Sequence, residues 1–294
     1  MSNIFLTGAS GFVGSNIKHS SYLKSHKFRF FDRTKIDLTG INAVFHFAGI
    51  AHDFEGFYTE KDYLEVNVEL TKRVYQEFLN SEASLFVYLS SVKAVTDNLE
   101  GVLDENTNPN PQTLYGTSKL IAEEYITSKS IPKEKRFIIL RPSLIYGKQN
   151  KGNLMLLYKL IRKTHIWPLN SFKNARSFCY VENLCFALNE FLQNEHIESG
   201  IYNICDDGSI STNDLVACIA RINKISFLNI CIPKKLINAI AKIGSKIDLP
   251  FNQITLNKLT QNYIVDNSKL VNALGKSFPY SLEEGLELTF YKED

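Results

Sequence analysis

Surplus charge, cysteine and long apolar runs are scarce in this chain of 294 residues. Its net charge of +2 provides no basic field for nucleic acid. The five cysteines are scattered and form no Cys-x-x-Cys pair, which argues against a zinc site or a disulfide framework. No His, Cys, Asp or Glu cluster has metal-ligand spacing, so we expect no metal. Reduced thiols of this kind are typical of a cytoplasmic protein.

The longest largely apolar stretch, residues 225–247, is interrupted by Pro233, Lys234 and Lys235. It is therefore too broken to span a bilayer. From Pro233 onward its pattern is amphipathic, which we interpret as a helix packed against the body of the protein rather than on a membrane or partner surface. The first residues lead directly into an apolar run, so we expect no signal peptide and no membrane insertion.

A glycine-rich turn lies near the start of the chain. Gly8, Gly11 and Gly14 follow the apolar residues 4–6 at three-residue steps, which predicts a strand, a tight turn and a helix. Glycine lets the backbone approach another group closely, and the amides that open a helix favour a phosphate. The spacing differs from the usual Gly-x-Gly-x-x-Gly fingerprint, so the turn alone leaves a purely structural role open.

Apolar segments and helical patterns alternate through the first half of the chain. This alternation predicts an α/β fold, a Rossmann-like doubly wound parallel sheet with helices on both faces. The connection after the second strand is short, so we expect an abbreviated crossover there. The predicted strands are 3–7, 28–32, 43–48, 84–90 and 136–141, and the predicted helices are 11–24, 61–81 and 115–130.

The pattern loosens after residue 150. We expect a dinucleotide-binding domain over 1–150, a segment near 177–206 that returns to it, and a smaller, mixed C-terminal substrate lobe over 151–294. Helices are predicted at 152–163, 181–194, 212–223, 234–245 and 282–291, with short extended pieces at 201–205 and 263–266.

Ligands of open parallel sheets bind at the carboxyl ends of the strands, where Asp32 follows the second predicted strand. A carboxylate there accepts hydrogen bonds from an adenosine ribose and favours NAD(H). The neighbouring Arg33 is able to hold a 2′-phosphate, which keeps NADP(H) open. A turn-forming aspartate is the structural alternative.

Tyr115 and Lys119 are four residues apart within a predicted helix and therefore share one face. An ammonium beside a phenol favours the phenolate and lowers the pKa of the tyrosine. Tyr115 is thus a candidate general acid or base that Lys119 tunes. Ser90 and Ser91, at the end of the strand 84–90, supply a nearby hydroxyl.

Taken in order, these motifs resemble the extended short-chain dehydrogenase/reductase superfamily, in its NAD-dependent nucleotide-sugar epimerase/dehydratase branch. The resemblance covers essentially the whole chain. The matching segments are TGASGFVG (7–14), HFAG (46–49), EVNVELT with Asn67, YLSS (88–91), YGTSK (115–119), RPSLIYG (141–147), NLM (153–155), RSFCYVENL (176–184), YIVDNSKL (263–270) and SLEEGL (281–286).

The resemblance implies a role for each position. Ser91 would hydrogen-bond the reacting sugar oxygen, Tyr115 would transfer the proton, and Lys119 would hold the nicotinamide ribose. The implied cofactor contacts are Gly8, Gly11, Phe12, Val13, Gly14, Asp32, Arg33, Ala48, Gly49, Asn67, Tyr115, Lys119, Pro142 and Leu144. The implied substrate contacts are Ser91, Val92, Lys93, Tyr115, Asn153 and Arg176, the last two on the nucleotide diphosphate.

One departure from the family pattern reduces the number of reactions that we expect. The 4,6-dehydratases carry an acidic pair after the serine or threonine, where this chain has Val92 and Lys93, which disfavours dehydration. A second arginine for the diphosphate is not obvious, so Arg176 would act with Lys258 or another group.

We therefore expect an NAD(P)-dependent oxidoreductase that acts at C4 of a nucleotide-linked hexose, with UDP as the expected nucleotide. A 4-ketoreductase in deoxysugar and surface polysaccharide biosynthesis is the first interpretation. A UDP-hexose or UDP-N-acetylhexosamine 4-epimerase is the alternative, and a non-catalytic dinucleotide-binding protein is a minor one. The resemblance also implies a homodimer through the helices 61–81 and 115–130.

Overall fold

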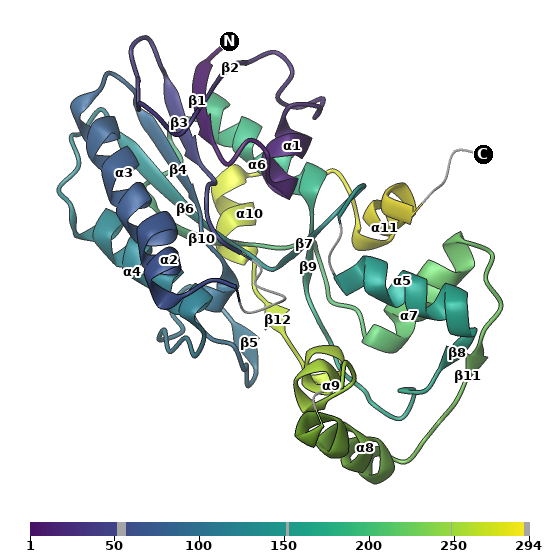
Figure 1. Ribbon diagram of the computed structural model, residues 1–294. Helices are drawn as coiled ribbons and strands as arrows, with labels where there is room; N and C mark the ends of the chain where they lie inside the picture. Colours follow the sequence, from purple (N-terminus) through teal and green to yellow (C-terminus); the bar gives the residue numbers. More distant parts are fainter. Residues whose placement is uncertain (52–56, 151–152, 248, 291–294) are drawn as a thin grey trace.

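Six parallel strands form the central sheet of the computed structural model, which describes residues 1–51, 57–150, 153–247 and 249–290 (Figure 1). The strand order is β10-β6-β4-β3-β1-β2, and every neighbouring pair is parallel. The predicted α/β class with a doubly wound parallel sheet is confirmed. The strands are β1 (Asn3–Thr7), β2 (Lys27–Phe30), β3 (Ala43–His46), β4 (Leu85–Leu89), β6 (Arg136–Pro142) and β10 (Gly200–Ile204).

Each strand buries side chains on both faces, because successive residues point to opposite sides of a sheet. In β1, Ile4 and Leu6 join a core that includes residues of α1, α6 and α10, whereas Phe5 joins a core that includes residues of α3 and α4. Figure 1 shows these two helical layers on either side of the sheet. The helices are α1 (Phe12–Ile17), α3 (Leu70–Asn80), α4 (Leu114–Ser128), α6 (Val181–Gln193) and α10 (Ser268–Leu274).

Two predicted helices differ from their expected form. The helix expected at 11–24 ends at Ile17, and the Ser20 hydroxyl in the turn beyond it donates to Glu182 Oε2 at 2.6 Å, which ties that turn to α6. The helix expected at 61–81 begins as α2 (Glu60–Tyr63), widens into a π-helical segment, η1 (Leu64–Glu69), and continues as α3. The connection 31–42 contains neither helix nor strand, as its short length predicts.

A separate apolar cluster is formed mainly by residues of the second half of the chain.

Two helices of this half, α9 and α10, are short and were not predicted from the sequence. Within the described residues, no helix is both long and apolar enough to cross a membrane. The further elements are η2 (Val92–Ala94), α5 (Asn153–Thr164), α7 (Thr212–Ile222), α8 (Lys234–Lys246), α9 (Gln253–Thr260), α11 (Leu282–Phe290) and the strand pairs β5 (Val102–Leu103) with β12 (Ile264–Val265), β7 (Leu144–Tyr146) with β9 (Phe178–Tyr180), and β8 (Ile166–Trp167) with β11 (Leu228–Asn229).

The two halves of the chain are interleaved. Strand β10 lies at the edge of the central sheet beside β6, and α10 contributes Leu270 and Leu274 to the core beneath it. Strand β12 pairs with β5 of the first half. The division into domains at residue 150 stays a prediction, as does the homodimer through the helices that became α2–α3 and α4.

The glycine turn after β1 generates a prediction about stability. A Cβ at position 14 would lie 2.2 Å from the carbonyl oxygen of Gly8, a backbone atom that cannot move aside cheaply. We expect Gly14→Ala to lower the free energy of unfolding by about 1–3 kcal/mol. Urea denaturation measures this change. Gly200→Ala is the matched control, because its new Cβ would meet its nearest neighbour at 3.6 Å. Equal losses in both variants would contradict the argument.

Candidate active site

The turn between β1 and α1 is shaped by close backbone contact. Gly8 adopts a φ of +75°, and a Cβ there would lie 2.5 Å from the carbonyl carbon of Phe47. Gly11 is the N-cap of α1, and its amide donates to the Gly8 carbonyl at 3.0 Å. Because Gly11 has no side chain to cap the helix, the amides that open α1 at Phe12 and Val13 are left for another acceptor. This tight cradle fits a diphosphate.

Three of the predicted site residues, Gly49, Asn67 and Lys119, meet just after the end of β3. Thr7 Oγ1 accepts the amides of Phe47 and Ala48, both at 3.1 Å. A Cβ on Gly49 would lie 3.0 Å from Asn67 Oδ1 and 3.2 Å from Lys119 Nζ. The structure therefore brings Gly49, Asn67 and Lys119 together at the carboxyl edge of the sheet.

Asn67 fixes the backbone of this edge from within the π-helical segment. Its Oδ1 accepts the Ile50 amide at 2.7 Å, and its Nδ2 donates to the Ile50 carbonyl at 3.1 Å and to Ser118 Oγ at 2.9 Å. The side chain is fully buried. Asn67 thus joins the turn after β3 to α4, and π-helical turns are frequent at functional sites.

Ser91 and Tyr115 come together at the end of β4. Ser91 is the N-cap of η2, and its Oγ accepts the Lys93 amide at 3.1 Å. Burial raises the pKa of Tyr115 to about 12, while a hydrogen bond with Ser91 acts in the opposite direction. The phenol is therefore protonated at neutral pH.

The expected tuning of Tyr115 by Lys119 is not what the structure shows. The Lys119 ammonium donates to the Leu89 carbonyl at 2.8 Å and lies 4.7 Å from the centre of the Tyr88 ring. Burial lowers the pKa of Lys119 to about 8, and the Glu123 carboxylate partly offsets it. A desolvated ammonium aimed at a strand end does not lower the pKa of Tyr115, which burial dominates.

A buried ion pair that the sequence patterns missed lies beneath these residues. Arg141 Nη2 and Glu123 Oε2 are 2.6 Å apart, and the two side chains are 3% and 2% exposed. Glu123 Oε1 also accepts hydrogen bonds from Ser90 Oγ and Arg141 Nε. The available signal was the helical spacing of Glu123, four residues after Lys119 and on the same face.

The predicted ribose contact lies on the surface. Asp32 Oδ1 accepts hydrogen bonds from the Thr34 amide at 2.9 Å and the Thr34 hydroxyl at 2.6 Å, and these bonds lower the pKa of Asp32. Asp32 Oδ1 thus holds a turn with Thr34, and Arg33 beside it has a φ of +73°.

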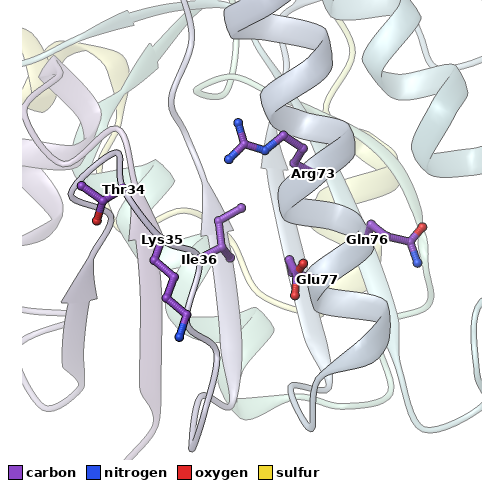
Figure 2. A pocket seen from close by; sticks show the side chains of 6 residues that line it. All are labelled: Thr34, Lys35, Ile36, Arg73, Gln76 and Glu77. Carbon is purple, nitrogen blue, oxygen red and sulfur yellow. The ribbon is translucent and has the colours of Figure 1, made fainter.

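An open pocket adjoins the same loop. Figure 2 shows it between segment 34–36 and α3, with the Arg73 side chain extending from α3 toward that segment. Its volume is about 440 Å³, and its lining residues are Thr34, Lys35, Ile36, Arg73, Gln76 and Glu77. None of these six belongs to the site predicted from the sequence.

The predicted nicotinamide segment contains an unpaired hydroxyl. Pro142 ends β6 and Leu144 begins β7. Between them, the Ser143 amide donates to the Ile204 carbonyl at 3.0 Å, whereas Ser143 Oγ is buried without a partner among the described residues. A polar group on a bound cofactor would satisfy it, so this segment fits the expected dinucleotide.

Lys93 and Arg176 lie close to each other where η2 faces the end of α9, and we call this side of the site the cationic wall. Lys93 Nζ donates to the Asp97 carbonyl at 3.0 Å and lies 4.5 Å from the centre of the Tyr263 ring. Burial lowers the pKa of Lys93, the Asp97 carboxylate counteracts this, and the Arg176 and Lys258 charges lower it further. These cations therefore share one neighbourhood.

The remaining predicted substrate contacts differ in how they are placed. Arg176 Nη1 donates to the carbonyls of Lys258 at 2.9 Å and Gln261 at 3.2 Å, which holds its guanidinium at the end of α9. Val92 is buried beneath Tyr263, whose hydroxyl donates to the Val92 carbonyl at 3.3 Å. Asn153 begins α5, but its side chain lies outside the described residues.

A parallel sheet with a glycine turn after β1 and polar side chains at the carboxyl ends of its strands is typical of the Rossmann class of dinucleotide-binding proteins. The chain also matches the NAD dependent epimerase/dehydratase family model over residues 4–205. It belongs to this family and is an NAD-dependent enzyme of the nucleotide-sugar epimerase, dehydratase and reductase group.

Curated relatives match along nearly the full length. The chain is 26% identical to a UDP-glucose 4-epimerase of Vibrio cholerae, covering 98% of this chain and 94% of the relative. It is 27% identical to an N-acetyl-alpha-D-glucosaminyl-diphospho-ditrans,octacis-undecaprenol 4-epimerase of Escherichia coli O157:H7, covering 99% and 95%.

Solved structures support the fold. A UDP-N-acetylglucosamine 4-epimerase from Bacillus cereus has a TM-score of 0.77 at 20% identity, with 98% of this chain and 97% of that chain covered. The structure titled RMD from Pseudomonas aeruginosa, complexed with NADPH, has a TM-score of 0.73 at 19% identity, with 99% and 98% covered. At these identities the likeness concerns the architecture.

The ion pair beneath the site generates a prediction. Glu123→Gln leaves Arg141 buried opposite a neutral amide, so we expect the free energy of unfolding to fall by about 3–5 kcal/mol. The exposed neighbour Glu124 provides the matched control, and Glu124→Gln should change stability by less than about 0.5 kcal/mol. Urea denaturation compares the two, and similar losses would show that the pair does not hold this region together.

The burial of the Lys119 ammonium leads to a prediction about how the free energy of unfolding depends on pH. The pKa of Lys119 falls from 10.5 to about 8 in the folded chain, so the unfolded chain holds more protons between these values. The contribution of Lys119 to the free energy of unfolding therefore rises with pH across this window, by at most about 1.4 kcal/mol per pH unit.

Lys119→Met removes this titration. The stability of the wild type relative to the variant should increase from pH 8 toward pH 10.5, as followed by urea denaturation at several pH values. Lys129→Met, at the exposed end of the same helix, is the matched control. A constant difference between wild type and Lys119→Met over this range would contradict the assigned burial effect.

Proposed function

We propose that the protein is an NAD(H)-dependent 4-ketoreductase that acts on a UDP-linked 4-keto hexose in deoxysugar and surface polysaccharide biosynthesis. The observation that carries this proposal is the Tyr115 phenol, whose pKa burial raises to about 12 and which interacts with Ser91, on the same helix as the buried Lys119. A raised phenol pKa suits a proton donor, which reduction of a ketone requires.

The proposed mechanism assigns one task to each side chain. When bound, the cofactor supplies the hydride that adds to C4. Tyr115 Oη donates its proton to the oxygen at C4 as that oxygen gains charge. Ser91 Oγ would orient the same oxygen, and Lys119 would bind the cofactor ribose. The bond formed to oxygen replaces the O–H bond lost by Tyr115.

The proposed cofactor contacts follow the edge of the sheet. Gly8, Gly11, Phe12, Val13 and Gly14 would receive the diphosphate at the start of α1. Asp32 would bind the adenosine ribose and favour NAD(H), while Arg33 leaves NADP(H) as the alternative. Ala48, Gly49 and Asn67 would lie along the dinucleotide, and Pro142 and Leu144 would contact the nicotinamide.

The proposed substrate contacts lie at the wall formed by α9 and η2. Arg176 and Lys93, with Lys258 nearby, would face the sugar diphosphate, and Asn153 would contact it from α5. The relatives from V. cholerae and E. coli O157:H7 are named for sugars carried on UDP and on undecaprenyl diphosphate, respectively. Both carriers present a diphosphate, and we propose UDP as the carrier here.

A 4-epimerase remains the second candidate, favoured by the names of the two curated relatives. An epimerase must withdraw hydride from C4 before returning it, so Tyr115 must first accept a proton. The pKa of Tyr115 near 12 opposes that first step more than it opposes reduction. The absence of a carboxylate at Val92 and Lys93 disfavours dehydration in either case.

Incubation with UDP-linked 4-keto hexoses and UDP-hexoses separates the candidates. We expect stoichiometric oxidation of NADH, read by absorbance, with formation of the C4 alcohol, read by NMR. Tyr115→Phe should lower kcat by about 10²–10⁴-fold, because it removes the transferred proton. Tyr125→Phe, on the same helix, should retain activity. Interconversion of C4 epimers without net NADH consumption would instead establish the epimerase.

A further inference from the structure

Helix α8 presents two different apolar stripes. Ile237, Ala241 and Gly244 are buried, and Gly244 brings the helix so close to the following segment that a Cβ there would lie 2.0 Å from the Phe251 carbonyl oxygen. This side packs on the body of the lobe, as the sequence predicts. The second stripe contains Leu236, Ile240, Ile243 and the C-cap residue Ile247, whose side chains are 53%, 48%, 58% and 63% exposed.

The exposed stripe follows helical geometry. Its members are spaced at four, three and four residues, so they form one continuous row along the helix. Among the described residues, these four side chains are 48–63% exposed, whereas Ile237 on the other stripe is only 3% exposed. In Figure 1, α8 lies at the bottom of the view, below α9 and away from the strands of the central sheet.

Lysines flank the exposed stripe. At 100° per residue, Lys235, Lys242 and Lys246 form a row beside it, on the side away from the buried stripe. The helix sequence KKLINAIAKIGSK contains four lysines and no acidic residue. An apolar row bordered by lysines is the pattern of a helix that lies in the headgroup region of an anionic bilayer.

We propose that α8 docks the protein on the surface of an anionic lipid bilayer, with Leu236, Ile240, Ile243 and Ile247 entering the headgroup boundary. A second copy of the chain fits this stripe less well. A two-fold interface centred on it would place the lysine rows of both copies near each other, without acidic partners on this helix. The helix lies along the surface and does not span the bilayer.

The docking surface is physically continuous with the candidate active site. The Leu249 amide donates to the Gly244 carbonyl at 2.9 Å, and the Gln253 amide donates to Ser245 Oγ at 3.0 Å, which fixes α9 on α8. The opposite end of α9 accepts the Arg176 guanidinium. A docked molecule would therefore hold Arg176 and the neighbouring Lys93 on the side of the protein that faces the headgroup layer.

Vesicle sedimentation tests the docking with no substrate present, so its outcome is independent of the proposed reaction. The purified full chain should sediment with vesicles that contain phosphatidylglycerol but not with phosphatidylcholine alone, and high salt should weaken the binding. Ile243→Asp should reduce the bound fraction by at least about fivefold, because it places a carboxylate in the apolar row.

Leu288→Asp is the matched control, since Leu288 is a 42% exposed leucine on α11, distant from α8 in Figure 1. It should bind vesicles as the wild type does, and both variants should keep wild-type activity on a nucleotide sugar. Equal loss in the two variants, or no sedimentation of the wild type with anionic vesicles, would overturn the proposal. So would a wild-type dimer that Ile243→Asp converts to a monomer in analytical ultracentrifugation.

Discussion

The buried pair of Glu123 and Arg141 is the contact on which the candidate site depends. Glu123 comes from α4, one turn after Lys119, and Arg141 comes from the end of β6, directly before Pro142. The same carboxylate accepts the hydroxyl of Ser90, next to Ser91. A single ionic contact therefore sets the relative positions of the three segments that carry the serine, the tyrosine with its lysine, and the predicted nicotinamide contact. Buried pairs of this kind are weak as net stabilisers but costly to break.

Burial also determines the chemistry above that pair. The low dielectric that favours the Glu123–Arg141 contact disfavours the charged forms of Tyr115 and Lys119, so the pKa of the phenol rises and that of the ammonium falls. Burial thereby moves the two pKa values apart, from 10.0 to about 12 for Tyr115 and from 10.5 to about 8 for Lys119. A phenol that keeps its proton until charge develops on the substrate oxygen is consistent with the direction of hydride transfer that we propose.

The substrate side is built by contacts that cross the two halves of the chain. The Tyr263 hydroxyl, next to β12, donates to the Thr96 carbonyl at 2.6 Å, and its ring supports the Lys93 ammonium. Arg176 is held by the end of α9, which in turn rests on α8. The position of the cationic wall thus depends on elements that lie far apart in sequence, and the same elements connect it to the exposed row on α8.

The sequence by itself determined the parallel sheet, because short, almost wholly apolar runs alternate with helical patterns, and both are local signals. It also determined the candidates Ser91, Tyr115 and Lys119, whose spacing on a strand end and a helix is local as well. Only the tertiary structure decided that Glu123 pairs with Arg141, that Asp32 caps a turn with Thr34, and that burial overrides Lys119 in setting the pKa of Tyr115. It likewise decided which stripe of α8 is covered. These outcomes depend on desolvation and on partners distant in the chain, and no local pattern encodes either.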